Sequence, residues 1–148
     1  MEIKKVDFNT ILPIWRDKLW PDRKTKIAPI SLIDLTGLFN KSIAEESVQF
    51  FACYDKDKVI GVNSLIQTSK LFCRSRGIWV DKKYRNKGIG KSIMKKTINN
   101  TKLLNCIYLW SMPRQSSLDF YIKCGFKQIS EFFDDYEFGP NFFVIQKI

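Results

Sequence analysis

Apolar residues recur at helical spacing in two stretches near the N-terminus. The first stretch has Pro13 in its opening turn, where a missing amide costs little, and the segment Trp20-Pro21-Asp22 ends it. The second stretch is interrupted by Gly37. The spacing therefore predicts two helices before the first hairpin. The apolar positions are Ile11, Ile14, Trp15 and Leu19 in the first stretch, and Leu32, Leu35, Leu38, Phe39 and Ile43 in the second.

The middle of the chain consists of strand-like segments separated by turns. Residues 50–54 and 59–62 flank the polar turn 55–58, a pattern typical of a hairpin. Residues 71–80 predict a further strand. Residues 106–110 are apolar on both faces, as in a buried parallel strand. We therefore expect a sheet with at least one parallel pair.

The remaining elements complete an α/β pattern. Residues 89–101 have an apolar face opposite lysines and predict an amphipathic helix. A short helix is expected over 118–124, and closing strands over 126–133 and 142–147, with a loop between them. Because 148 residues is an ordinary size for one domain and no linker or repeat interrupts them, we expect one domain over 1–148.

A basic turn at 85–90 joins the strand that ends at residue 80 to the following helix. Its glycines, Gly88 and Gly90, let the backbone approach a phosphate, where unpaired amides and the helix dipole favour negative charge. The P-loop pattern fails because Arg85 stands at its first glycine, and the dinucleotide pattern fails because Ile93 stands at its third. The turn therefore predicts an anion site of another type.

Two segments carry a resemblance to a known family. Arg85-x-x-Gly88-x-Gly90 after an Ile-x-Val strand resembles the Arg/Gln-x-x-Gly-x-Gly/Ala motif of the GCN5-related N-acetyltransferase (GNAT) superfamily. Residues 118–126, Leu-Asp-Phe-Tyr-Ile-Lys-Cys-Gly-Phe, resemble its second signature. The resemblance covers roughly 59–147. It implies a mixed, mostly antiparallel central sheet of six to seven strands flanked by about four helices, the acyl-CoA N-acyltransferase fold.

The resemblance also implies a cosubstrate, acetyl-CoA, and roles for particular residues. The backbone of the strand 78–80 would pair with the pantetheine arm, with the Val80 amide facing the thioester carbonyl. Tyr121 would protonate the departing thiolate, since a phenol with a pKa of about 10 stays protonated at neutral pH. Arg114 stands where many members have the asparagine that contacts pantetheine, and Trp79 should point to the other sheet face. The coenzyme residues implied are Ile78, Trp79, Val80, Arg85, Asn86, Lys87, Gly88, Ile89, Gly90, Lys91, Arg114 and Tyr121.

Charge and composition favour a polyanionic ligand and argue against a metal site. The formal net charge is +10, and eight basic residues but no acidic one lie between Lys82 and Lys102. A polyanion such as coenzyme A fits this distribution. Histidine is absent, and the four cysteines form no Cys-x-x-Cys pair, so we expect no metal site and reduced cysteines in the core. The first seven residues lack the apolar core of a signal peptide, and no stretch approaches the roughly 18 apolar residues that a membrane span needs. We therefore expect a cytoplasmic protein, monomeric or homodimeric.

The resemblance also implies where the acceptor binds, between the loop that joins the first two helices and the loop that joins the last two strands. A basic first loop (Arg16, Lys18, Arg23, Lys24, Lys26) and an acidic last loop (Glu131, Asp134, Asp135, Glu137) favour a small molecule with an amine and an anionic group. Alternatives are a protein N-terminus or lysine as acceptor, a non-catalytic coenzyme A-binding domain, and a basic nucleic-acid-binding domain. The candidate general bases are Glu45, Glu46, Asp81, Asp134, Asp135 and Glu137.

Overall fold

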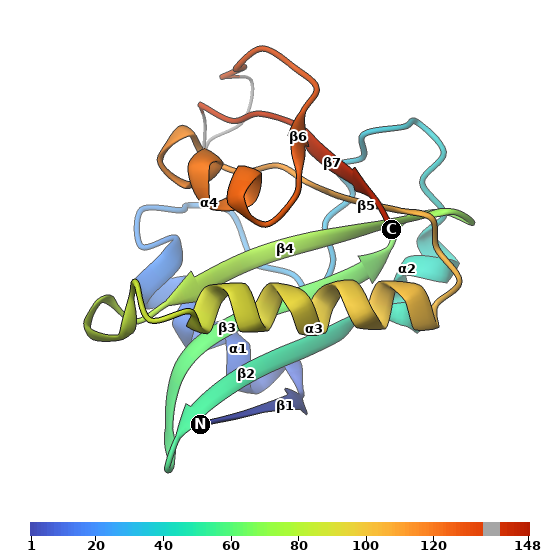
Figure 1. Ribbon diagram of the computed structural model, residues 1–148. Coiled ribbons are helices and arrows are strands. Elements are labelled where there is room, and N and C mark those ends of the chain that lie inside the picture. The colour runs from blue at the N-terminus through green and yellow to red at the C-terminus, as the bar shows by residue number, and fades with distance from the viewer. Residues whose placement is uncertain (135–139) are drawn as a thin grey trace.

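Seven strands form one sheet in the order β1-β2-β3-β4-β5-β7-β6 (Figure 1). The computed structural model describes residues 1–134 and 140–148. The strands are β1 (Glu2–Val6), β2 (Gln49–Asp55), β3 (Lys58–Gln67), β4 (Phe72–Val80), β5 (Tyr108–Ser111), β6 (Lys127–Gln128) and β7 (Val144–Lys147). The helices are α1 (Phe8–Ile14), its π-helical continuation η1 (Trp15–Leu19), α2 (Lys41–Ser47), the 3-10 turn η2 (Lys82–Tyr84), α3 (Ile89–Leu103), the 3-10 turn η3 (Gln115–Ser117) and α4 (Leu118–Lys123).

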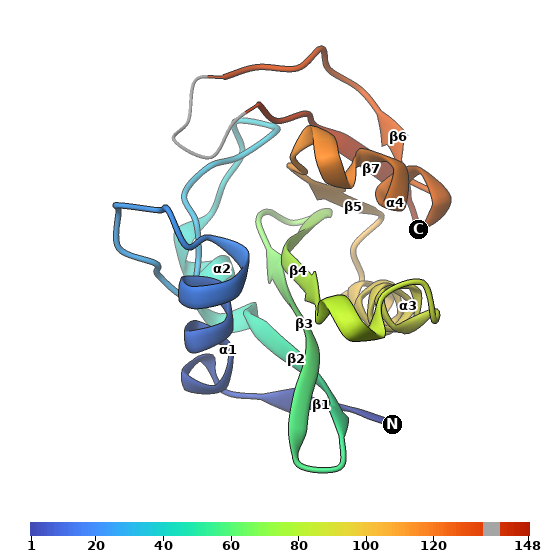
Figure 2. The same cartoon turned by 90° about the vertical axis from the view of Figure 1, so that its left-hand side faces the viewer.

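Helices cover both faces of the sheet. Figure 2 shows α1 and α2 on one side and α3 on the other. On the α3 side, Met94 and Leu109 pack with Tyr121 of α4, while Trp15 and Val62 pack in the cluster beneath α1. Among the described residues, no helix is both long and apolar enough to span a membrane.

The sheet has one parallel junction. Every pair of neighbouring strands is antiparallel except β4 and β5. Residues 72–74 of β4 pair with residues 108–110 of β5. Beyond them β4 continues to Val80, whereas β5 ends at Ser111. The expected mostly antiparallel sheet and its buried parallel strand are therefore confirmed, and the strands separate within the predicted coenzyme region.

A bulge in β4 depends on the first helix. The register with β3 shifts between Val62 and Ser64, opposite Gly77, whose φ is +79°. The buried indole of Trp15 donates from Nε1 to the Gly77 carbonyl at 2.8 Å, and a Cβ on Gly77 would lie 2.4 Å from that ring. Only glycine fits this position, because the backbone is left-handed and the indole occupies the side-chain volume.

Three sequence predictions are corrected by the structure. The helix expected across 32–43 is irregular up to Asn40: Asp34 Oδ2 accepts from the amide of Leu38, and Asn40 caps α2 by accepting from the amide of Ile43. The strand expected at 126–133 is shorter, only β6, and the one expected at 106–110 begins at Tyr108. The edge strand β1 was not predicted at all.

Candidate active site

The edge of β4 that faces away from β3 is open beyond the parallel junction. The amide of Asp81 donates to the Ile60 carbonyl of β3 at 2.8 Å. Because the peptide groups of a strand alternate in direction, those of Ile78 and Val80 face the opposite edge. There Arg85 Nε donates to the Val80 carbonyl at 2.9 Å. This edge can accept an extended ligand as an additional strand.

The side chains of the same segment alternate between the sheet faces. Ile78 and Val80 pack in the α3-side cluster with Ile89 and Ile93, while Trp79 packs in the cluster beneath α1. The alternation predicts this difference. Trp79 can therefore contribute backbone, not its ring, to a ligand on the α3 face.

The turn before α3 presents unpaired amides. Asn86 and Gly88 have left-handed backbones, with φ of 62° and 82°. Within the part of the chain that the structure describes, the amides of residues 86–91 make no hydrogen bond, and the first bond of α3 runs from Ser92 to the Gly88 carbonyl at 3.0 Å. A Cβ on Gly88 would meet no heavy atom within 4 Å. Exposed amides at the N-terminus of a helix favour an anion.

The second glycine of the motif has a packing role. A Cβ on Gly90 would lie 3.0 Å from Cε1 of Phe120 in α4. The absence of a side chain lets α4 approach the first turn of α3. This contact holds α4 at the place from which Tyr121 points into the core.

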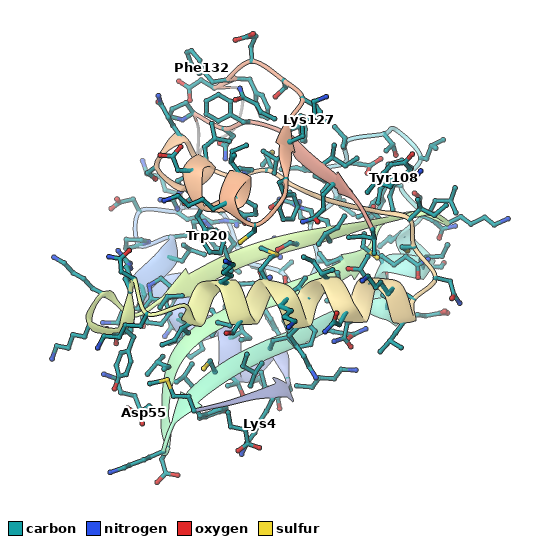
Figure 3. All side chains as sticks on the ribbon, in the orientation of Figure 1. Lys4, Trp20, Asp55, Tyr108, Lys127 and Phe132 are labelled. Atoms are coloured by element: carbon teal, nitrogen blue, oxygen red, sulfur yellow. The ribbon has the colours of Figure 1, made fainter. Side chains whose placement is uncertain are left out.

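A cavity of about 110 Å³ lies where β4 and β5 separate. Residues 74–78 of β4, residues 111–114 and Tyr121 line it from the sheet and α4, and Leu19, Trp20 and Arg23 line it from the first loop. Figure 3 labels Trp20 near this end of the sheet and Tyr108 at the opposite end of β5. Of the predicted site residues, the cavity brings together Ile78, Arg114 and Tyr121; Val80 and the turn lie further along β4.

Tyr121 is buried, and its hydroxyl lies at the point where β4 and β5 separate. Ser111 Oγ lies 2.7 Å from the Ser75 carbonyl oxygen and 3.2 Å from Tyr121 Oη. A carbonyl only accepts, so the single proton of Ser111 is used in the shorter bond, and Tyr121 can direct its own proton toward Ser111 Oγ. Burial raises the pKa of Tyr121. The phenol therefore stays protonated at neutral pH.

Arg114 is attached to the first loop. Its Nη2 donates to the Leu19 carbonyl at 2.8 Å, and burial lowers its pKa. The side chain thus connects the segment after β5 with the end of η1. It lines the cavity, where we predicted a pantetheine contact.

Sequence reasoning missed two arginines of β4. Arg74 and Arg76 are 6% and 4% exposed, and both line the cavity. The guanidinium of Arg74 lies over the Trp110 ring, 5.0 Å from its centroid, and that of Arg76 lies over Trp15 at 4.9 Å. The available signal was two arginines two residues apart in an otherwise apolar strand, which alternation places on one face.

Of the carboxylates predicted as candidate general bases, those that the structure describes do not line the cavity. Asp81 caps η2 and pairs with Lys58 at 3.3 Å, and Glu45 pairs with Lys41 at 3.7 Å. Asp135 and Glu137 lie outside the described residues. Among the residues that are described, no aspartate or glutamate lines the cavity, and of the predicted basic-loop residues only Arg23 does.

Comparison with known structures shows the same fold in several acetyltransferases. An acetyltransferase from Streptococcus agalactiae is 18% identical, with a TM-score of 0.70, and the match covers 99% of this chain and 98% of that one. A GNAT-family acetyltransferase from Staphylococcus aureus is 20% identical, with a TM-score of 0.67 and coverage of 99% and 98%. An aminoglycoside 6'-N-acetyltransferase complexed with coenzyme A is 12% identical, with a TM-score of 0.72 and coverage of 99% and 97%.

These likenesses confirm the predicted acyl-CoA N-acyltransferase fold. No curated protein matches the sequence. The acetyltransferase (GNAT) domain, as a sequence family, matches residues 46–128, which is more than half of the chain and includes β4, the turn, α3 and α4. The chain therefore belongs to the GNAT acetyltransferase domain family.

Proposed function

We propose that this protein transfers an acetyl group from acetyl-CoA to a primary amine of a small molecule by direct attack, with Tyr121 as the general acid. The observation that carries the proposal is the buried hydroxyl of Tyr121 in a cavity beside the open edge of β4. We also propose that residues 1–148 form one domain, which acts in the cytoplasm as a monomer or homodimer.

The residues present fit acetyl-CoA at three places. The amides of residues 86–91 are free to bind the diphosphate, and Gly88 leaves space for it. The edge of β4 at Ile78 and Val80 would pair with the pantetheine arm. The exposed lysines around the turn, Lys82, Lys83, Lys87 and Lys91, supply positive charge.

Acetyl-CoA, when bound, supplies a thioester for attack by the amine. The Val80 amide would donate to the thioester carbonyl oxygen as it gains negative charge. Tyr121 would give its proton to the sulfur as the carbon–sulfur bond breaks, and the amine's proton would leave through water. The positive charges of Arg76 and Arg114, which line the cavity, would lower the pKa of a bound ammonium and favour the attacking neutral amine.

The small volume of the cavity supports a small acceptor over a protein N-terminus or lysine. A nucleic-acid partner is less well supported, because the lysines are concentrated on one turn and one helix. The buried Tyr121 supports catalysis over coenzyme binding alone.

A thermal-shift panel of acetyl-CoA, other acyl-CoAs, NAD, ATP and oligonucleotides tests the coenzyme. At a hundredfold excess over Kd, acetyl-CoA should stabilise the fold by about 2.7 kcal/mol. A screen with radiolabelled acetyl-CoA tests the acceptor. Label on polypeptides only, and never on amino acids, polyamines or aminoglycosides, would contradict the small-molecule proposal.

A further inference from the structure

A chain of buried polar side chains leads from Tyr121 through the core on the α3 side of the sheet. Its members are Ser111 on β5, Ser75 on β4, Asn63 on β3 and Thr97 on α3. Asn63, Ser75 and Thr97 are fully buried, and Ser111 is 3% exposed. Polar groups held out of water are costly unless they are hydrogen-bonded. Each member therefore needs a partner, and the partners determine where its proton points.

The far end of this chain has fixed hydrogen-bond directions. Thr97 Oγ1 donates to the Ile93 carbonyl at 3.0 Å, so it can only accept from the Asn63 carboxamide. Asn63 Nδ2 donates to Thr97 Oγ1 at 3.0 Å and to Ser75 Oγ at 2.9 Å, which uses both of its protons. Ser75 Oγ lies at a longer 3.3 Å from Asn63 Oδ1. Because Ser75 accepts from the amide nitrogen, its own proton can turn toward Tyr121.

Two serines act on the Tyr121 hydroxyl. Ser111 Oγ lies 3.2 Å from Tyr121 Oη and donates to the Ser75 carbonyl at 2.7 Å. Burial raises the pKa of Tyr121, whereas side-chain hydrogen bonding to Ser111 and to Ser75 lowers it. The charge of Arg74 on β4 also lowers this pKa, and Cys124 at the end of α4 raises it. Hydrogen bonds that lower the pKa of a phenol are those that favour its ionised form.

We propose that Ser111 and Ser75 are positioning residues, which hold Tyr121 as an acid and then stabilise its phenolate. Before the transfer, Tyr121 donates to Ser111 Oγ, so its hydroxyl is held where β4 and β5 separate. As the O–H bond of Tyr121 breaks and its proton goes to the sulfur, both serines turn their O–H groups onto the phenolate oxygen. Each serine keeps its own proton, and Ser111 leaves the Ser75 carbonyl to do so. This inference rests on the proposed acetyl transfer.

The burial of Tyr121 is the reason that such donors matter. Its side chain is 3% exposed, so water has little access to a negative charge that forms on Oη. Donors that are already in place stabilise such a charge without reorganisation, and they do so more strongly than in water. Ser64 on β3 provides a comparison, because its Oγ also donates to a β4 carbonyl at 2.7 Å, that of Arg76. Alternation places Ser64 on the other face of the sheet, away from Tyr121.

The pKa of Tyr121 can be measured without turnover. Replacing the five tyrosines with 3-fluorotyrosine makes each phenol more acidic, and the fluorine resonance that Tyr121→Phe removes belongs to residue 121. Ser111→Ala and Ser75→Ala should each raise this pKa, because each removes a donor to the phenolate. Ser64→Ala is the matched control, since it loses the same kind of buried bond, and should leave the pKa unchanged. A pKa that is unchanged or lower in both of the first two variants would overturn the proposal.

Kinetics separate positioning from a structural role. Ser111→Ala should lower kcat about tenfold or more with little change in the KM for acetyl-CoA, because a hydrogen bond to a charged group is lost only in the transition state. Ser111→Thr, which keeps a hydroxyl, should recover part of the loss. In a Tyr121→Phe background, Ser111→Ala should lower kcat no further, because its effect passes through the phenol. Equal falls in both backgrounds, or wild-type kcat in Ser111→Ala, would refute the assignment.

The two proposals fail in distinguishable ways. If acetyl-CoA binds but no amine is acetylated, the acetyl transfer fails, while the fluorotyrosine titration still decides whether the serines stabilise the phenolate. If Ser111→Ala does not fold, as circular dichroism would show, Ser75→Ala tests the same hydrogen bonding from β4. A normal titration of Tyr121 in that variant would then count against the proposal.

Discussion

Replacing Tyr121 with phenylalanine removes one oxygen atom from the base of the cavity and keeps the ring. The ring packs edge-on against Phe120 and Phe126, at centroid distances of 5.5 and 5.2 Å, so the variant retains these contacts. Ser111 keeps its bond to the Ser75 carbonyl, so no buried donor loses its partner. The substitution therefore separates a chemical role of the hydroxyl from a structural one.

The two expected magnitudes differ. Loss of one neutral hydrogen bond should lower the free energy of unfolding by about 1 kcal/mol. If the hydroxyl protonates the leaving thiolate, kcat should fall about a hundredfold, equivalent to about 2.7 kcal/mol of transition-state stabilisation. A large fall in kcat with a small change in stability is the expected result.

The assay is release of free thiol at saturating substrates, with urea unfolding of both proteins. Tyr108→Phe is the matched control, because Tyr108 stacks on Phe72 away from the cavity. Burial raises the pKa of Tyr121, and an acid acts in its protonated form. The wild-type kcat should therefore fall through deprotonation of Tyr121 only above the ordinary tyrosine pKa of about 10. Wild-type turnover in Tyr121→Phe, with chemistry limiting, would refute the assignment.

Three further predictions concern the coenzyme turn and its support. Gly88→Asp should abolish the thermal shift with acetyl-CoA, whereas Gly37→Asp, which has a similar positive φ and equally open surroundings, should retain it; a retained shift in the first would remove the turn from the site. Gly90→Ala should lower the free energy of unfolding by about 1 kcal/mol through its contact with α4, and an unchanged urea midpoint would contradict this. Trp15→Phe should cost about 3 kcal/mol, because it leaves a gap and an unpaired carbonyl at Gly77, and stability within 1 kcal/mol of the wild type would argue against this role of the indole.

The spacing of apolar residues was sufficient to predict the helices and strands whose apolar residues form a clear stripe or run. The apolar stripe of α3 and the apolar runs on either side of the polar turn 55–58 identified α3, β2 and the start of β3, although β3 continues to Gln67, beyond the predicted end at residue 62. It failed where side chains replace backbone bonds, as in 31–40, whose apolar spacing imitates a helix although Leu32 and Leu38 are 67% exposed. It also failed for β1, an edge strand that carries Glu2, Lys4 and Lys5 on its exposed positions.

The candidate site was predictable only in part, because its cavity arises from a difference in strand length. That Ile78 lies on an open edge follows from β5 ending at Ser111 while β4 continues, and no motif records this. The resemblance pointed to Tyr121, and the structure places it in that opening. Arg74 and Arg76 escaped notice because the groups that they contact, the Trp110 ring and the Ala28 carbonyl, belong to segments distant in the sequence.

The contact between Gly90 and Phe120 couples the residue types that the two motif segments can accept. The related motif tolerates alanine at the position of Gly90, but here an alanine Cβ would meet the phenylalanine ring at 3.0 Å. Alanine at 90 should therefore be tolerated better where a smaller residue already stands at 120, since with Phe120 in place the ring has to move by a few tenths of an ångström. Substitutions at these two positions should accordingly tend to appear together among its descendants.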